Sequence, residues 1–423
     1  MQLLSSKWIF LACQQMRRLW FRASLYCLVA VVTALLAAMV DERIPGTLAT
    51  RVGADSVGNL LGILAASMLT VATFSLSTLV SSYSAAATSA TPRATRLLVE
   101  DSVAQNALAT FIGAFLFAVV GIIALSSGIY GNGGRLLLLL VTVGVVVLVV
   151  LTLLRWIDQL SNLGRVGETV RRVETVTRAA LEQRASSPAC GARLLEREPQ
   201  QGFAVLPRDV GYIQHVDLGF LQALCEELEC RIWVLAMPGD SVEPTRPILR
   251  ISCEPDGDTA QRLRDAFVIG SERTFEQDPG FGFVVLGEIA ARALSPAVND
   301  PGTAIDVIQT GLRLLVFWAE NGHKDENPEI RFPDIWVPGP CEAHWFDNLY
   351  TAIAREGAAQ VEVIDALQQS FSTLKRLQVQ AYREPLAAQA ARALLFAEAR
   401  MTHPDDVRRV RDSAPSPFHD DKD

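Results

Sequence analysis

The chain has 423 residues, half of them hydrophobic, and its mean hydropathy of +0.25 is high for a soluble protein. Its formal charge is −8 and no basic stripe with interleaved aromatic residues occurs, so nucleic acid is not an expected partner. The seven cysteines form no CxxC pair, so we expect neither a disulfide framework nor a zinc site, and we predict no cofactor or metal.

Four apolar segments are long enough to cross a bilayer. Residues 1–21 carry Lys7, Arg17 and Arg18 beside tryptophans, and they predict an interfacial segment that leads into the membrane. The apolar run that follows is longer than the core of a signal peptide and lacks a convincing cleavage site, so it is interpreted as an uncleaved first span. The predicted spans are residues 22–40, 57–80 with a helical extension to 90, 106–127 and 135–154.

Basic residues are concentrated before the first span, in the loop with Arg93 and Arg96, and after the fourth span. The positive-inside rule therefore places both termini in the cytoplasm of a bacterium, with the spans in the inner membrane. Pro92 ends the second helix before Arg93 and Arg96, and these three residues predict a corner at the membrane interface.

Hydroxyl groups are unusually dense on one face of the second span. Residues at steps of three, four or seven fall near one face of a helix, and the candidates for lining a pore are Ser67, Thr70, Ser77, Ser81, Ser84 and Thr88. The alternative is that small hydroxylated residues let helices pack closely. No ionisable residue lies within the four apolar cores, which argues against a coupled transporter.

The region after the fourth span changes character twice. Residues 156–190 predict a helical stalk, either an oligomer stem or a helix packed on its own domain. Residues 191–256 contain short runs such as VGYIQHV and RIWVLAM, which predict a small β-barrel-like domain. No lysine occurs between Lys7 and Lys324, so attachment of biotin or lipoate is excluded for this segment.

Residues 257–410 predict a helical cytoplasmic domain, and residues 411–423 a disordered tail. The predicted fold class is thus a membrane all-α domain of four transmembrane helices, residues 22–155, followed by a cytoplasmic α+β domain with a small β-barrel and a helical C-terminal part.

Two polar segments of the helical domain are candidates for a ligand site or for a structural latch between helices. They are GSERTFEQDPGFG, with Arg273, Thr274, Gln277 and Asp278, and ARALSPAVNDPGTA, with Arg292, Ser295, Asn299, Asp300 and Thr303. Ser295 lacks a GxSxG context and a histidine nearby in sequence, so a hydrolase is rejected and no catalytic residue is predicted. Asp300 followed by Pro301 is also a good helix start, which favours the latch.

The same motifs, with SATPRATRLLVED and PGDSVEPTRPILRI, resemble a bacterial family of predicted membrane proteins, domain of unknown function 2254, over roughly residues 15–400. The resemblance implies a multi-pass inner-membrane protein with a cytoplasmic domain and no established activity. The chain departs from the family pattern at Ala297, where glycine is usual, at Gly302, where a bulkier residue is usual, and at Thr245, where glycine is expected.

The predicted function is an oligomeric channel or passive conduit with a cytoplasmic regulatory domain, and not an enzyme. The alternative is a membrane-anchored ligand sensor or scaffold without transport. The expected partners are the lipid bilayer, further copies of the chain, and a small ion or anionic ligand.

Overall fold

The structure is a computed structural model that describes residues 19–39, 54–99, 101–127, 132–162, 164–322 and 329–415. The described chain divides into two compact units. The membrane unit is formed by residues 19–88 and 95–165, and the soluble unit by residues 89–94 and 166–415, each with the gaps given above.

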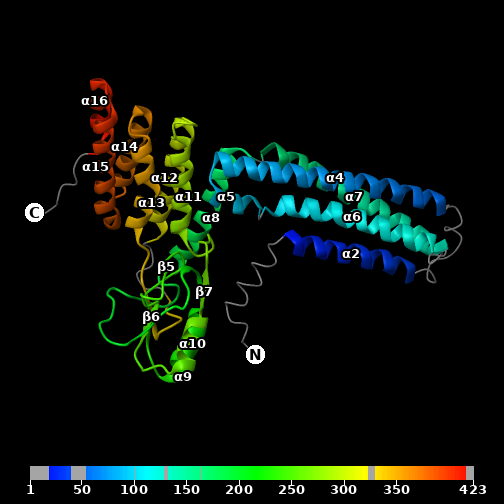
Figure 1. The fold of residues 1–423 in the computed structure, drawn as a ribbon, viewed down its shortest axis with the longest axis horizontal. Coiled ribbons are helices and arrows are strands. Elements are labelled where there is room, and N and C mark those ends of the chain that lie inside the picture. The colour runs from blue at the N-terminus through cyan, green and yellow to red at the C-terminus, as the bar shows by residue number, and fades with distance from the viewer. Residues whose placement is uncertain are drawn as a thin grey trace, which may run out of the picture. The chain divides into compact units, whose positions relative to one another are not determined.

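The membrane unit is built from long helices that run side by side (Figure 1). They are α2 (Leu19–Met39), α4 (Ala54–Ser89), α6 (Ser102–Ser126) and α7 (Asn132–Asn162). Three of them, α4, α6 and α7, are long and apolar enough to cross a membrane, whereas the apolar stretch found in α2, Trp20–Thr33, is shorter. Three candidate spans are therefore shown, and the fourth predicted span is not confirmed.

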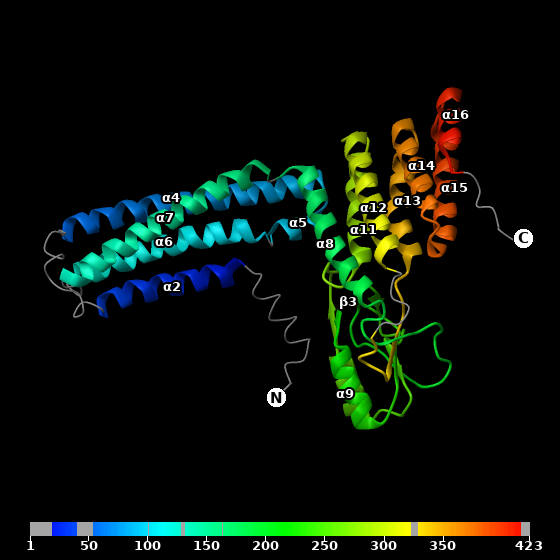
Figure 2. The same cartoon turned by 180° about the vertical axis from the view of Figure 1, so that it is seen from behind.

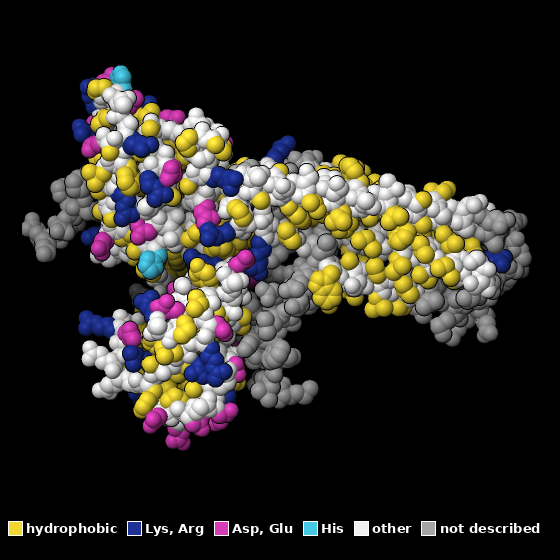
Figure 3. Space-filling model, viewed as in Figure 1, with side chains coloured by type: hydrophobic (Ala, Val, Ile, Leu, Met, Phe, Trp, Pro, Cys, Tyr) yellow, Lys and Arg dark blue, Asp and Glu magenta, His cyan; other side chains and the backbone are white. Residues whose placement is uncertain are grey.

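The central helix of the membrane unit is α6. Small residues such as Ala107 and Ala114 let its neighbours approach, and Phe111 and Phe117 are almost fully buried between them. Its apolar window is 56% buried, against 28% for α4 and 17% for α7, so the outer faces of those two helices stay uncovered. Figure 3 shows hydrophobic side chains spread over this unit.

A short helix, α5 (Pro92–Val99), makes the corner before α6. Asp101 caps α6 by accepting hydrogen bonds from the backbone N–H groups of Val103 (2.7 Å) and Ala104 (3.2 Å). The amide of Gln159 on α7 donates to the other oxygen of Asp101 at 2.6 Å, which ties the corner to the end of α7.

The soluble unit contains two small sheets. The five-stranded sheet has the order β1-β8-β4-β6-β2, with β8 parallel to β1 and β4, and the three-stranded sheet has the order β5-β3-β7 and is antiparallel. The strands are β1 (Arg193–Leu194), β2 (Phe203–Val205), β3 (Gly211–Val216), β4 (Ile232–Val234), β5 (Ser241–Val242), β6 (Leu249–Ile251), β7 (Phe267–Gly270) and β8 (Ile335–Val337). Neither sheet closes on itself in the described residues, so the small β-barrel is not confirmed.

Helices cover the sheets and form a separate layer beyond them (Figure 2). They are α8 (Val166–Ser186), α9 (Leu218–Leu228), α10 (Gly257–Asp265), α11 (Pro279–Ala293), α12 (Pro301–Asn321), α13 (Glu342–Glu356), α14 (Val361–Arg376), the 3-10 turn η2 (Gln380–Tyr382), α15 (Arg383–Arg400) and α16 (Pro404–Ser413). The apolar stripe of α8, with Val170, Val173 and Leu181 buried, packs on α11 and α12 of its own unit.

Some predicted boundaries differ from those in the structure. FVIG at 267–270 is β7, although helix was expected, because a short run of β-branched and aromatic residues pairs with β3. Ile335–Val337, which lies between Pro333 and Pro338 within the region predicted to be helical, pairs with β1 and β4. Residues 411–413 of the predicted tail belong to α16, and residues 1–18 and 416–423 lie outside the described residues.

Candidate functional site

The hydroxyl-rich side of α4 faces away from the bundle. The side chains of Leu61, Met68 and Leu79 pack inward, and all six predicted pore-lining residues, Ser67, Thr70, Ser77, Ser81, Ser84 and Thr88, are exposed on the single chain. The face is therefore left open by the chain's own helices.

The hydroxyls on this face divide into two kinds. Ser67, Thr70 and Thr88 donate to backbone carbonyls of their own helix at 2.7, 3.0 and 2.9 Å. Ser77, Ser81 and Ser84 have no side-chain hydrogen bond within the described residues, so their hydroxyls remain available to water or to another chain. The large apolar residues exposed on α4 run from Leu60 to Val80, a rise of about 30 Å, which equals the thickness of the hydrocarbon core.

Of the predicted corner residues, Pro92 and Arg93 belong to the soluble unit and Arg96 to the membrane unit, and Arg93 lies beside α11. The hydroxyl of Thr91 donates to a carboxylate oxygen of Glu288 at 3.0 Å, and Arg93 forms an ion pair with the same carboxylate. Glu288 was not among the predicted site residues. The sequence did contain an indication that Glu288 is unusual, because it is the one acidic residue in the apolar run FGFVVLGEIAARAL.

The first polar segment forms a compact buried arrangement at the start of α11. Arg273 donates to both carboxylate oxygens of Asp278, at 2.8 and 3.0 Å, and Asp278 also accepts from the backbone N–H of Phe281 at 3.0 Å. Burial raises the pKa of Asp278 to about 6, although the guanidinium of Arg273 acts in the opposite direction. Gly239, with φ at +100°, lies against this carboxylate, and a β-carbon there would collide with it.

The neighbours of this pair continue the arrangement. Thr274 is buried, and the side-chain oxygen of Gln277 lies 3.2 Å from Nδ1 of His215 on β3. A cavity of about 460 Å³ opens beside Asp278, and Arg273, Gln277, Asp240 and His344 are among its lining residues. We call it the Asp278 cavity.

The second polar segment lies at the other end of α11 and is mostly exposed. Asp300 caps α12: its carboxylate accepts from the backbone N–H of Thr303 at 3.1 Å and from the Thr303 hydroxyl at 2.6 Å. The Thr303 hydroxyl is the main cause of the lowered pKa of Asp300. Ser295 donates to the carbonyl of Arg292 at 2.7 Å, so its hydroxyl closes the end of α11.

Asn299 adopts a left-handed φ of +50° and accepts a hydrogen bond from Gln360 at 2.9 Å. The 15 residues of α11 separate the two segments by about 22 Å. Arg273 therefore pairs with Asp278 of its own segment and not with Asp300, and the two carboxylates are too far apart to act as one acid–base pair.

Several lining residues were not singled out from the sequence. Arg184, at the end of α8, lines the Asp278 cavity and a second cavity next to it, and His215 and Arg331 line the second one. Residues distant in sequence meet here only because the sheets fold, so no local pattern indicates them. The described residues contain no group of three or more His, Cys, Asp and Glu side chains suited to a metal ion.

Comparisons with known proteins agree with this architecture. The model of the family described as "Predicted membrane protein (DUF2254)" matches residues 16–373. The uncharacterized protein Rv1290c of Mycobacterium tuberculosis and the uncharacterized protein Mb1321c of Mycobacterium bovis are each 26% identical to this chain over 372 residues, which cover 84% of this chain and 70% of the relative. No solved structure matches. Since the family model spans most of its length, the chain belongs to this family of predicted membrane proteins.

Proposed function

We propose that this protein is an oligomeric passive conduit in the bacterial inner membrane, in which the hydroxyl-rich face of α4 lines the path. The observation that carries the proposal is that this face is exposed on the single chain, while Ser77, Ser81 and Ser84 leave their hydroxyls unbonded within the described residues. A helix surrounded only by lipid gains nothing from such groups, whereas water or a neighbouring subunit can bond to them.

The position of the hydroxyls along α4 supports a continuous path. Ser67, Thr70 and Ser77 fall within the exposed apolar stretch that ends at Val80, and Ser81 lies just beyond it. Polar groups would thus extend from the depth of the bilayer to its edge. Hydroxyls carry no net charge, so the conduit would pass water or small ions with weak selectivity.

The membrane arrangement in this proposal has four spans, with α2 as the first. The apolar stretch of α2 is short, but it packs against α6, and the basic residue Arg22 near its start donates to Asn106 at 3.0 Å. An even number of spans agrees with the basic residues on either side of the unit, which by the positive-inside rule favour the cytoplasm for both termini.

The test is a double substitution, S77L/S81L, in the full chain reconstituted into a planar bilayer. Leucine keeps the helix and fills the face with apolar side chains, so conductance should be lost while the oligomeric mass stays unchanged. A matched control is L69A, which changes the exposed α4 face outside the six candidates and should leave the conductance near that of the wild type. Unchanged currents in S77L/S81L would overturn the proposal.

A second candidate function is a membrane-anchored ligand sensor. The observation in its favour is that Arg273, Gln277 and Asp278 line the Asp278 cavity of about 460 Å³. In this case a ligand from a metabolite panel should raise the melting temperature of the wild type and not that of R273A. A panel that shifts neither protein would count against the sensor.

A further inference from the structure

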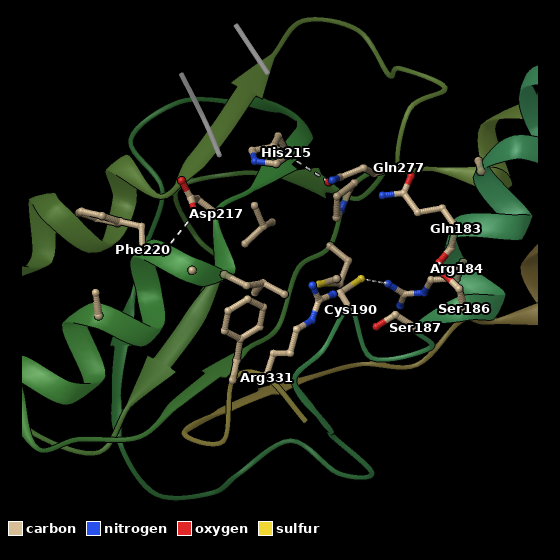
Figure 4. A pocket seen from close by; sticks show the side chains of 18 residues that line it. Gln183, Arg184, Ser186, Ser187, Cys190, His215, Asp217, Phe220, Gln277 and Arg331 are labelled. Carbon is tan, nitrogen blue, oxygen red and sulfur yellow. Dashed lines mark hydrogen bonds between the residues drawn. The ribbon is translucent and has the colours of Figure 1, made fainter. Parts of the chain in front are cut away.

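A second cavity of about 530 Å³ lies in the soluble unit where the end of α8, the start of α9 and the segment before β8 come together (Figure 4). We call it the Arg331 cavity. Its volume falls within the usual range for small-molecule sites, about 300–1,000 Å³. It shares Arg184, Met237, Pro238 and Gln277 with the Asp278 cavity, but Arg331, His215 and Phe220 line only this one.

Two guanidinium groups line one side of the Arg331 cavity. Arg184 donates to the sulfur of Cys190 at 2.7 Å and to the carbonyl of Pro338 at 3.0 Å. Figure 4 shows Arg331 approaching Cys190 from the other side. Neither arginine has a carboxylate partner among the described residues, so two positive charges at this wall are left without a counter-charge from the described chain.

The backbone holds Arg331 in place. Cys190 and Gly191 have φ angles of +53° and +81°, so the chain turns sharply after α8. The carbonyl of Gly191 accepts the backbone N–H groups of both Arg331 and Phe332, each at 2.8 Å. These bonds fix the backbone of Arg331 at the edge of the cavity, so the side chain starts from a defined position.

The rest of the lining is mainly apolar, with a few polar groups. Phe220, Met237 and Phe332 supply apolar surface, and His215 with Gln277 forms a hydrogen-bonded pair at 3.2 Å. Asp217 is 2% exposed and its carboxylate caps α9 by accepting from the backbone N–H of Phe220 at 3.0 Å. The carboxylate of Asp217 would repel an anionic ligand. Only the side of the cavity that is lined by Arg184 and Arg331 therefore suits an anion.

We propose that the Arg331 cavity binds a small organic anion, with one carboxylate or phosphate group on Arg184 and Arg331 and an apolar body against Phe220 and Phe332. The planar guanidinium matches both anionic groups through paired hydrogen bonds. The inference does not depend on the conduit, because the cavity lies wholly within the soluble unit.

The first experiment uses phenyl phosphate, which combines one anionic group with an apolar ring, and the full chain in lipid nanodiscs. Phenyl phosphate should bind to the wild type in calorimetry, whereas phenol, which lacks the anion, and inorganic phosphate, which lacks the ring, should bind at least about tenfold more weakly. Equal binding of phenol, or no binding of phenyl phosphate at millimolar concentration, overturns the proposal.

The matched variants are R331Q and R208Q. Arg331 lines the cavity, whereas Arg208 is an exposed arginine of the same unit outside it. R331Q should weaken the binding of phenyl phosphate about tenfold or more, and R208Q should leave it unchanged. If R331Q binds as well as R208Q, the anion does not sit on Arg331 and the assignment is wrong.

Alkylation of cysteines distinguishes the two cavities. Cys190 lines the Arg331 cavity and the exposed Cys341 lines the Asp278 cavity. Phenyl phosphate should slow iodoacetamide labelling of Cys190 and leave Cys341 unaffected, as measured by peptide mass spectrometry. Protection of Cys341 alone would move the ligand to the Asp278 cavity and contradict the proposal.

The anion can come from a soluble metabolite or from a lipid headgroup. Dihexanoyl phosphatidic acid below its micelle concentration carries the same phosphate on an acyl body. If it competes with phenyl phosphate, the proposal holds with a lipid as the source. If it does not compete, the proposal holds with a soluble metabolite as the source.

Discussion

Two helices of the soluble unit begin with the same three residues, Asp-Pro-Gly, and their aspartates behave in opposite ways. Asp278 begins α11 and Asp300 begins α12, and in both cases the carboxylate accepts the N–H of the third residue of the helix. Burial raises the pKa of Asp278, whereas hydrogen bonds from Thr303 lower that of Asp300. The same capping arrangement is therefore accompanied by a raised carboxylate pKa at the start of α11 and by a lowered one at the start of α12.

The difference comes from what surrounds each cap. Asp278 lies under Gly239 and beside Arg273, next to a cavity. Asp300 lies on the surface, and its side-chain donor is its own neighbour Thr303. A local motif thus establishes that a helix begins, and only the tertiary contacts decide whether its carboxylate is a surface cap or part of a candidate site.

The largest expected effect is from R273A. This change removes the partner of the buried Asp278 carboxylate and should lower the free energy of unfolding at pH 8 by about 3 kcal/mol. Chemical denaturation of the full chain in detergent, followed by tryptophan fluorescence, measures it. R292A is the control, since Arg292 has no ion pair among the described residues, and it should cost less than about 0.5 kcal/mol. A loss in R273A no larger than in R292A would contradict the buried pair.

The next effect is the pH dependence of Asp278. The pKa rises from 3.8 to about 6 on folding, so the folded chain holds this proton more tightly than the unfolded chain. The associated stability is complete below the unfolded pKa and is lost as the pH rises through about 6, a change of about 3 kcal/mol. Relative to D278N, the wild type should therefore lose melting temperature between pH 4 and pH 7. A constant difference across that range would show that the pKa is not raised.

The smallest effect is at the surface cap. D300A removes the acceptor for the N–H of Thr303 and should cost about 1 kcal/mol near neutral pH, whereas D300N should cost less because asparagine also caps helices. The lowered pKa of Asp300 reverses the pH dependence: its stability is present above the ordinary aspartate pKa and is lost as the pH falls. Melting curves of D300A and the wild type should converge in acid, and divergence there would refute the assignment.

Much of the architecture could be predicted from local sequence. The spans that became α4, α6 and α7 and the strands β3 and β4 follow from apolar runs and their period. The strands β7 and β8 were missed because FVIG directly follows a helical pattern and the IWV of β8 lies between Pro333 and Pro338, and both segments are paired by partners distant in sequence.

The candidate sites were predictable to different degrees. The spacing of the hydroxyl residues predicted the hydroxyl-rich face of α4, because the helical period determines which residues lie on the same side of a helix. The contacts of Arg184 with the carbonyl of Pro338 and of Arg93 with Glu288 join residues that only the fold brings together. The sequence contained all these residues but no local rule that pairs them.

The measurement that tests the proposed conduit most directly combines the oligomeric mass of the purified full chain in mild detergent with current recordings from the same preparation in a planar bilayer. The proposal predicts a closed ring of subunits, because only a ring can enclose the α4 faces, together with discrete single-channel currents. A monomer or dimer that carries no current would contradict it, and the Asp278 cavity would then become the site to probe.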